Sequence, residues 1–363
     1  MNKLIKIAKR FGKIMLQPVI ATVLGLLVGA VFIMASNENP IAIYLNMFQK
    51  SFFSPYYLTQ TLTRATPIII CGIAIAAAWR AGYINIGVEG QMIAGSFAAT
   101  IVAIYVPLPG FLLLPLALVT GMVVGGLYAS LVAVLNLKFN SSIVICTLML
   151  NYVANYVASY FVSYPFRDSS GDGLSLMTKT VPTSTHFLQF SSSNTLNLGI
   201  VVAVLVTVLF YFIERKTVFG YESKMTGLNP HFAKYGGVFE KKVMLKTMAL
   251  SGGIAALAGM CEIFGYKYRY TDSMFTSASY AWTGLMAALI ADLHPVGILA
   301  ASIFLSGLQV GGQAIQRSSS IPLQMATVIQ SSITLFVSVK LGIRFLKKRK
   351  QAKKHDGEGA VTS

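Results

Sequence analysis

Residues 62–106 read LTRATPIIICGIAIAAAWRAGYINIGVEGQMIAGSFAATIVAIYV, which is two apolar segments joined by a stretch rich in glycine and polar residues. Each apolar segment has about the 20 residues that a helix needs to cross the hydrocarbon core of a bilayer. The connecting stretch, WRAGYINIGVEGQ (79–91), places Asn85, Glu89 and Gln91 among glycines. The pattern predicts two membrane helices and a polar junction between them.

The whole chain has this apolar character, with 55% hydrophobic residues, 11% charged residues and a mean hydropathy of +0.66 over 363 residues. A soluble protein of this length needs a larger polar surface. We therefore predict an all-α, polytopic transmembrane helical bundle of about ten spans in a single domain, 1–346, followed by a disordered basic tail, 347–363. The predicted spans are 16–35, 62–79, 86–106, 111–136, 142–163, 196–214, 243–264, 279–293, 295–313 and 322–341.

Two of the predicted segments leave alternatives open. The short segment 279–293 ends just before Pro295, and it is either a half-helix, a re-entrant segment or the first part of the next span. The first span follows a basic stretch, as a signal peptide would, but its apolar run is longer than a signal peptide requires and no small-x-small cleavage site follows. A retained membrane anchor is the better interpretation.

The positive charges predict the orientation. The chain carries a net charge of +17, and ten spans starting inside place 22 of the 29 Lys and Arg residues on one side of the membrane. Cytoplasmic loops of membrane proteins carry such an excess, so we expect both termini in the cytoplasm. The loops expected outside include 36–61 and 164–195. The same distribution accounts for the charge without a nucleic-acid partner.

No motif of an enzyme occurs in the sequence. There is no HExxH, no GxSxG and no phosphate-binding loop, and His and carboxylate residues do not cluster at the spacing of metal ligands. Cys71, Cys146 and Cys261 lie in apolar runs and are interpreted as small buried residues rather than a disulfide framework or zinc site. We expect neither catalysis nor a cofactor in this chain, so energy for uphill transport has to come from a partner or an ion gradient.

The junction at 79–91 contains the first candidate site. If the stretch from Asn85 onward is one helix, then Asn85, Glu89, Ser96 and Thr100 lie on one face and small residues lie on the other. The glycines of the junction equally allow a broken helix. An ionisable group at membrane depth is costly unless it is partnered. Two interpretations of Glu89 follow: it holds helices together near the inner interface, or it contacts the substrate. The candidate substrate-pathway residues are Asn85, Glu89, Gln91 and Ser96.

The second candidate site is the long basic segment ESKMTGLNPHFAKYGGVFEKK (222–242). Asn229 or Thr226 is expected to cap a short helix with Pro230 in its first turn. A basic loop that only fixes topology would not need this pattern of Gly, Asn and Pro. The sharper interpretation is a docking element for a cytoplasmic partner.

Three stretches in order resemble one family. WRAGYINIGVEGQMIAG, GLNPHFAKYGG and ALIADLHPVGILAAS resemble the permease subunits of bacterial ABC importers for nucleosides and simple sugars, within the branched-chain amino acid and ribose permease family. The likeness covers about 60–342. It implies alternating access driven by a cytoplasmic ABC ATPase, a second permease subunit in an expected heterodimer, and an extracytoplasmic substrate-binding lipoprotein. It also implies that a set of residues in 222–242 docks on the ATPase, namely Gly227, Asn229, Pro230, Ala233, Tyr235 and Gly237.

The chain departs from that family pattern at two places. Phe232 stands where a small residue often precedes the alanine, and 291–294 replaces a turn that more often contains glycine. The full NIGVEGQ and GLNP motifs favour a nucleoside as substrate, with import of a ribose-like sugar as the alternative. A stand-alone secondary transporter is the competing class; it predicts partnered acidic residues at mid-membrane, for which Glu89 is the one good candidate in the sequence.

Overall fold

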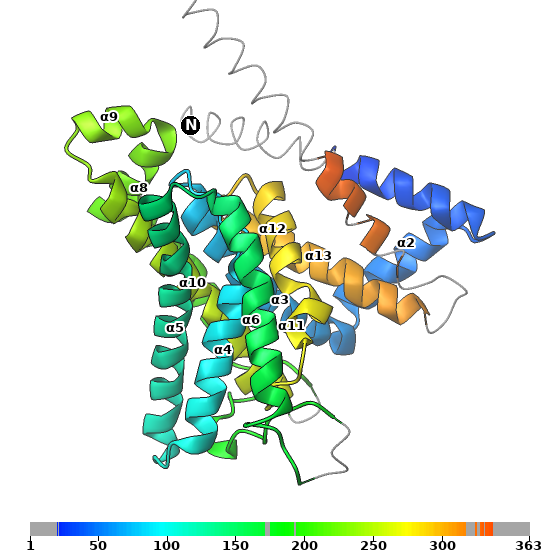
Figure 1. Ribbon diagram of the computed structural model, residues 1–363. Coiled ribbons are helices and arrows are strands. Elements are labelled where there is room, and N and C mark those ends of the chain that lie inside the picture. The colour runs from blue at the N-terminus through cyan, green and yellow to red at the C-terminus, as the bar shows by residue number, and fades with distance from the viewer. Residues whose placement is uncertain are drawn as a thin grey trace, which may run out of the picture. The chain divides into compact units, whose positions relative to one another are not determined.

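The computed structural model describes residues 20, 22–170, 175–191, 194–316, 324, 327–329 and 331–336. Within these ranges the regular structure is helical, and the only β pairing is three isolated bridges, which confirms the all-α prediction (Figure 1). The chain divides into two compact units, one of Phe52–Gly307 and one of Met1–Ser51 with Leu308–Ser363. The basic tail 347–363 and both termini lie outside the described residues, so their order and their cytoplasmic location stay predictions.

Among the described residues, six helices are long and apolar enough to cross a membrane, so the count of about ten spans is not confirmed. A seventh crossing is counted if 22–35 and 40–53, which meet at an angle of 120°, form one bent span. The predicted spans 16–35 and 322–341 lie partly outside the described residues. The six helices are α3 (Pro55–Trp79), α4 (Val88–Tyr105), α5 (Gly110–Phe139), α6 (Ile143–Ser163), α10 with its extension η3 (Glu240–Lys267) and α13 (Pro295–Gln316).

Two predicted spans are helices that are not among these six. The segment predicted at 196–214 is α7 (Gly199–Lys216), whose last turn carries Glu214, Arg215 and Lys216. The segment predicted at 279–293 is α12 (Tyr280–Ile290), which has 11 residues. At the rise of an α-helix this length extends over only about 16 Å, roughly half of the hydrocarbon core of a bilayer. A separate five-residue helix, α11 (Met274–Ala278), precedes it. The half-helix alternative therefore describes α12 best.

The segment 36–61, expected to be a loop outside the membrane, contains helices instead. It holds α2 (Pro40–Phe48), the π-helix η1 (Gln49–Phe53) and the start of α3. The Asn39 side chain accepts hydrogen bonds from the backbone N–H groups of Ile41 and Ala42, and Pro40 occupies the first turn. These residues are a standard helix start, and the prediction from hydropathy overlooked them.

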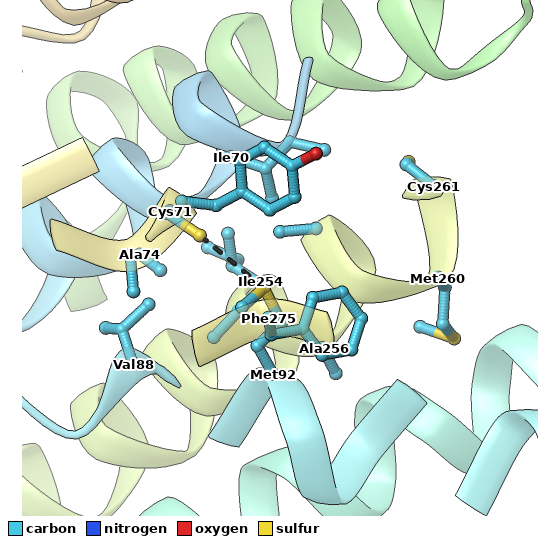
Figure 2. Close-up of a cluster of buried hydrophobic side chains, with 14 of the residues drawn as sticks. Ile70, Cys71, Ala74, Val88, Met92, Ile254, Ala256, Met260, Cys261 and Phe275 are labelled. Atoms are coloured by element: carbon cyan, nitrogen blue, oxygen red, sulfur yellow. Dashed lines mark hydrogen bonds between the residues drawn. The ribbon is translucent and has the colours of Figure 1, made fainter. Parts of the chain in front are cut away.

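The core of the unit Phe52–Gly307 forms where α10 packs against α3, α4 and α5. Gly125 of α5 and Gly252 of α10 face each other so closely that a Cβ on Gly252 would overlap with the Gly125 carbonyl oxygen. Small residues let membrane helices approach in this way. Figure 2 shows the apolar cluster beside this contact, where the Cys71 thiol lies 3.9 Å from the Met92 sulfur. Cys71 and Cys261 are buried and Cys146 is partly buried, each as a free thiol.

The junction between α3 and α4 is not helical. α3 ends at Trp79, Arg80 caps it, and α4 does not begin until Val88. Gly82 adopts a φ of +89°, which turns the chain out of the helix. Asn85 therefore does not share a helical face with Glu89 and Ser96 as the spacing suggested, and the broken-helix alternative is the one that the structure contains.

Candidate functional site

The Asn85 side chain holds the junction together from inside. Its amide nitrogen donates to Gln91 Oε1 and to Ser251 Oγ, each over 3.0 Å, and its amide oxygen accepts from Gly87 N at 2.9 Å and from Gln91 Nε2 at 3.0 Å. Ser251 of α10 in turn donates to the Ala74 carbonyl of α3 at 2.7 Å. Asn85 and Ser251 are completely buried, and Gln91 is nearly so. One amide thus ties α3, α4 and α10 to each other.

A second amide, which the sequence interpretation missed, supports the same junction from α6. Asn151 accepts a hydrogen bond from Gly90 N at 2.8 Å and donates to the Ile86 carbonyl at 3.1 Å. Thr147, one turn earlier, accepts from Ile86 N at 3.4 Å. Thr147 and Asn151 are polar residues four apart in an apolar helix, and that spacing was the available signal. Together they supply partners to backbone groups that the broken helix leaves open.

Ser96 bonds to its own helix. Its hydroxyl donates to the Met92 carbonyl at 2.6 Å, and Thr100 donates to the Ser96 carbonyl at 2.8 Å. Ser96 is fully buried. Among the four predicted pathway residues, Asn85, Gln91 and Ser96 are therefore occupied by contacts within the protein, and substrate contact by any of them stays a prediction that would require those contacts to open.

Glu89 lies differently from the other three. It sits in the first turn of α4, where the helix dipole favours a negative charge. Its side chain accepts a hydrogen bond from the Thr276 hydroxyl of α11 at 2.7 Å. The Thr276 hydroxyl also lies 3.5 Å from Asn155 Oδ1 of α6. Glu89 is 7% exposed and borders a narrow recess, whose other lining residues are Ile75, Ile86, Val88, Ala281, Trp282 and Leu285.

The recess is small in this structure, with a volume of about 10 Å³. That volume corresponds to about one water molecule, far less than an organic solute needs. Its walls come from α3, α4 and α12, so any enlargement requires these helices or the α11–α12 segment to move. Its lining contains one carboxylate, Glu89, and one aromatic ring, Trp282, and is otherwise apolar.

Another acidic side chain is buried in this unit. Glu262 is 4% exposed and accepts a hydrogen bond from the Tyr280 hydroxyl at 2.9 Å. Tyr280 is the first residue of α12. Glu89 is therefore not the only buried acid, and both acids bond to the α11–α12 segment. Among the described residues, no group of His, Cys, Asp and Glu is arranged to hold a metal ion.

The predicted coupling segment is mostly helical. α8 (Val218–Leu228) and α9 (Pro230–Tyr235) meet at Asn229, and together they lie at one end of the unit (Figure 1). Asn229 Oδ1 accepts from Phe232 N at 3.1 Å and Pro230 opens α9, which confirms the cap expected there. The alternative cap, Thr226, instead donates to the Glu222 carbonyl within α8.

The side chains of this segment divide into an inner and an outer set. Ala233 is buried, and Gly227 presses against the end of α3, where a Cβ on it would overlap with the Arg80 carbonyl oxygen. Gly237 turns the chain toward α10 with a φ of +80°. Phe232 and Tyr235 are exposed, Tyr235 by 94%. The predicted docking residues therefore include both surface groups and groups that position the surface.

The turn between α12 and α13 has an unusual backbone. Asp292 has a φ of +50° and Leu293 a φ of +62°. This left-handed conformation costs about 1 kcal/mol or more for residues other than glycine. The Leu293 carbonyl accepts a hydrogen bond from the Arg80 guanidinium at 3.1 Å, and Pro295 then starts α13. The turn thus keeps a glycine-like shape although 291–294 contains no glycine.

Comparison with known proteins agrees with this architecture. Residues 57–338 match the family described as the permease component of the branched-chain amino acid transport system. The guanosine ABC transporter permease protein NupP of Bacillus subtilis (strain 168) is 33% identical, over 92% of this chain and 95% of its own. The nucleoside ABC transporter permease protein NupB of Lactococcus lactis subsp. cremoris (strain MG1363) is 31% identical, over 95% and 98%.

A relative named for a sugar is similar to about the same degree. The glucose ABC transporter permease protein TsgB13 of Haloferax volcanii is 31% identical, over 88% of this chain and 86% of its own. These relatives are transporter permeases rather than enzymes, and the family match covers almost all of the six helices that are long enough to cross a membrane. The chain belongs to the family of permease components of the branched-chain amino acid transport system.

Proposed function

We propose that this chain is the membrane-spanning subunit of an ATP-driven importer of nucleosides in a bacterial cell membrane. The observation that carries the proposal is the similarity, over more than nine tenths of the chain, to one relative named for guanosine and one named for nucleosides. Import of a simple sugar is the second candidate, which the relative named for glucose favours.

The proposed complex contains several chains. A cytoplasmic ABC ATPase docks on the exposed side chains of α8 and α9, a second permease subunit completes a heterodimer, and an extracytoplasmic lipoprotein delivers the substrate. The exposure of Phe232 and Tyr235 supports the docking role, because exposed aromatic side chains are typical anchors of protein interfaces. The docking residues remain Gly227, Asn229, Pro230, Ala233, Tyr235 and Gly237.

The proposed transport step is alternating access without covalent chemistry. ATP binding draws the two ATPase chains together and moves α8 and α9, and the permease pair switches its opening from one side of the membrane to the other. Within this chain, Glu89 is the group best placed to meet a polar substrate, because it lines a recess while Asn85, Gln91 and Ser96 make hydrogen bonds inside the protein.

The test is uptake by cells that carry or lack this gene. We expect labelled guanosine to accumulate only in cells with the gene, unlabelled nucleosides to compete, and glucose to have no effect at equal concentration. Competition by glucose alone would transfer the assignment to sugars. Uptake that persists after the ATPase partner is deleted, but stops when ion gradients are collapsed, would support a secondary transporter instead.

A further inference from the structure

Arg80 brings together three parts of the chain that lie far apart in sequence. Its guanidinium forms an ion pair with Glu214 at the end of α7. The same guanidinium donates to the Leu293 carbonyl in the α12–α13 turn over 3.1 Å. Both charged side chains are largely shielded, with 27% of the Arg80 side chain and 12% of the Glu214 side chain exposed. This ion pair is therefore less weakened by water than one on an open surface.

The Arg80 backbone makes the third contact. Its carbonyl oxygen touches Gly227 of α8 so closely that even a methyl group there would overlap with it. Gly227 is separated by one residue from Asn229, which caps α9. Any displacement of α8 that moves Gly227 toward α3 therefore pushes directly on the residue that holds Glu214 and Leu293.

The partner of Arg80 in the α12–α13 turn is held in a costly conformation. Leu293 has a φ of +62°, and its carbonyl points at the Arg80 guanidinium. Backbone in this region persists only where its surroundings hold it. The Arg80 hydrogen bond is one such restraint, so its loss would free the turn between α12 and α13.

Aromatic and basic groups surround the same point. The Arg215 guanidinium stacks on the Tyr211 ring at 4.3 Å from its centre, and the Tyr211 ring meets the His294 ring edge-on at 6.3 Å. Burial lowers the pKa of His294, and the nearby charges of Arg80 and Arg215 lower it further, against a smaller opposing effect of Glu214. His294 thus adds little positive charge beside Arg80 near neutral pH.

We propose that Arg80 is a positioning residue that transmits movement of α8 and α9 to the α12–α13 turn. The inference rests on the proposed function, because it supposes that an ATPase moves α8. Arg80 itself touches neither ATPase nor substrate in this proposal. Arg80 is followed directly by 81–87, which leads into α4, so movement of Arg80 also reaches the segment that positions Glu89.

The first test uses the assembled transporter with its ATPase and second permease subunit. We expect Arg80→Gln to keep ATPase co-purification and ATP hydrolysis while lowering uptake at least tenfold. Glu214→Gln should give a similar but smaller loss. The exchange Arg80→Glu with Glu214→Arg should recover part of the uptake, which a loss of folding would not allow. Lys138→Gln, at the exposed end of α5, is the matched control and should transport normally.

The second test needs no substrate, so it separates this inference from the nucleoside assignment. Val296 is 56% exposed at the start of α13, and a Val296→Cys variant is labelled with a water-soluble maleimide in a Cys146→Ser background. We expect ATP to change the labelling rate in the parent and in Lys138→Gln, and not in Arg80→Gln. An ATP response that is absent in the parent, or is unchanged in Arg80→Gln, overturns the proposal. If guanosine uptake is absent but the labelling pattern is as expected, the nucleoside assignment fails and the proposed role of Arg80 stands.

Discussion

Replacing Asn85 with leucine removes four hydrogen bonds while nearly preserving the side-chain volume. The bonds run to Gln91 at both ends of its amide, to Gly87 N and to Ser251 Oγ, over 2.9 to 3.0 Å. Ser251 keeps its bond to the Ala74 carbonyl. Three buried groups therefore lose their partner: the Gly87 N–H and the two polar atoms of the Gln91 amide.

The cost follows from those three groups. A buried polar group left without a partner costs about 1–3 kcal/mol, and partial rearrangement of Gln91 keeps the total at about 3–6 kcal/mol. Each kcal/mol lowers the Tm of a chain of a few hundred residues by about 2 °C, so we expect a decrease of about 6–12 °C. Substrate contact by Asn85 alone would lower uptake without this loss of stability.

The assay is thermal unfolding of the purified chain in detergent, with uptake measured in parallel. Asn136→Leu is the matched control, because Asn136 at the end of α5 donates one hydrogen bond, to the Ser141 carbonyl, and is only partly buried. That variant should lose about 1 kcal/mol, or roughly 2 °C. A Tm for Asn85→Leu within about 2 °C of the parent would refute the interpretation of Asn85 as the group that ties α3, α4 and α10.

Three further predictions concern Glu89, the docking surface and Gly227. Glu89→Gln can still accept the hydrogen bond from Thr276 but lacks the negative charge. Because hydrogen bonds to charged groups are stronger than those to neutral groups, we expect the loss of charge to weaken the proposed substrate contact and to lower uptake about tenfold or more at an unchanged Tm. Normal uptake at normal expression would leave Glu89 with only a structural role. Tyr235→Ala should weaken co-purification of the ATPase. Leu188 is 76% exposed but lies outside α8 and α9, so Leu188→Ala is the control and should not weaken it. Equal losses in the two variants would exclude specific docking at Tyr235. Gly227→Ala must displace the Arg80 carbonyl and should cost about 1–3 kcal/mol in unfolding. Gly236→Ala, whose added Cβ would be 3.4 Å from its nearest neighbour, should be nearly neutral; equal Tm values would contradict the close contact at Gly227.

The sequence predicted the local features of this fold well. Asn229 and Pro230 specify a helix start through groups only three residues apart, and the structure places that start where the pattern did. The apolar segments likewise located the helices α3 to α6 and α10 to within several residues. Capping and hydropathy depend on neighbours along the chain, so a sequence displays them directly.

The features that define the site depend instead on distant partners. Ser251 lies 166 residues from Asn85, and Thr276 lies 187 residues from Glu89, so no spacing rule links either pair. The helical period wrongly aligned Asn85 with Glu89, because one glycine with a positive φ breaks the helix between α3 and α4. Long-range contacts and single backbone rotations are what pattern analysis of one sequence misses.

The hydrogen bonds of Asn85 and the lining of the recess at Glu89 are formed by different side chains, and this separation matters for changing the proposed substrate selectivity. Trp282 and Leu285 on α12 line the recess, yet neither contributes to the bonds among Asn85, Gln91 and Ser251. Substitutions at Trp282 and Leu285 can therefore reshape the recess while the joint between α3 and α4 stays intact. Under the proposal that Glu89 meets the substrate, a library for altered solute selection should vary Trp282 and Leu285 and keep Asn85, Gln91 and Ser251 fixed.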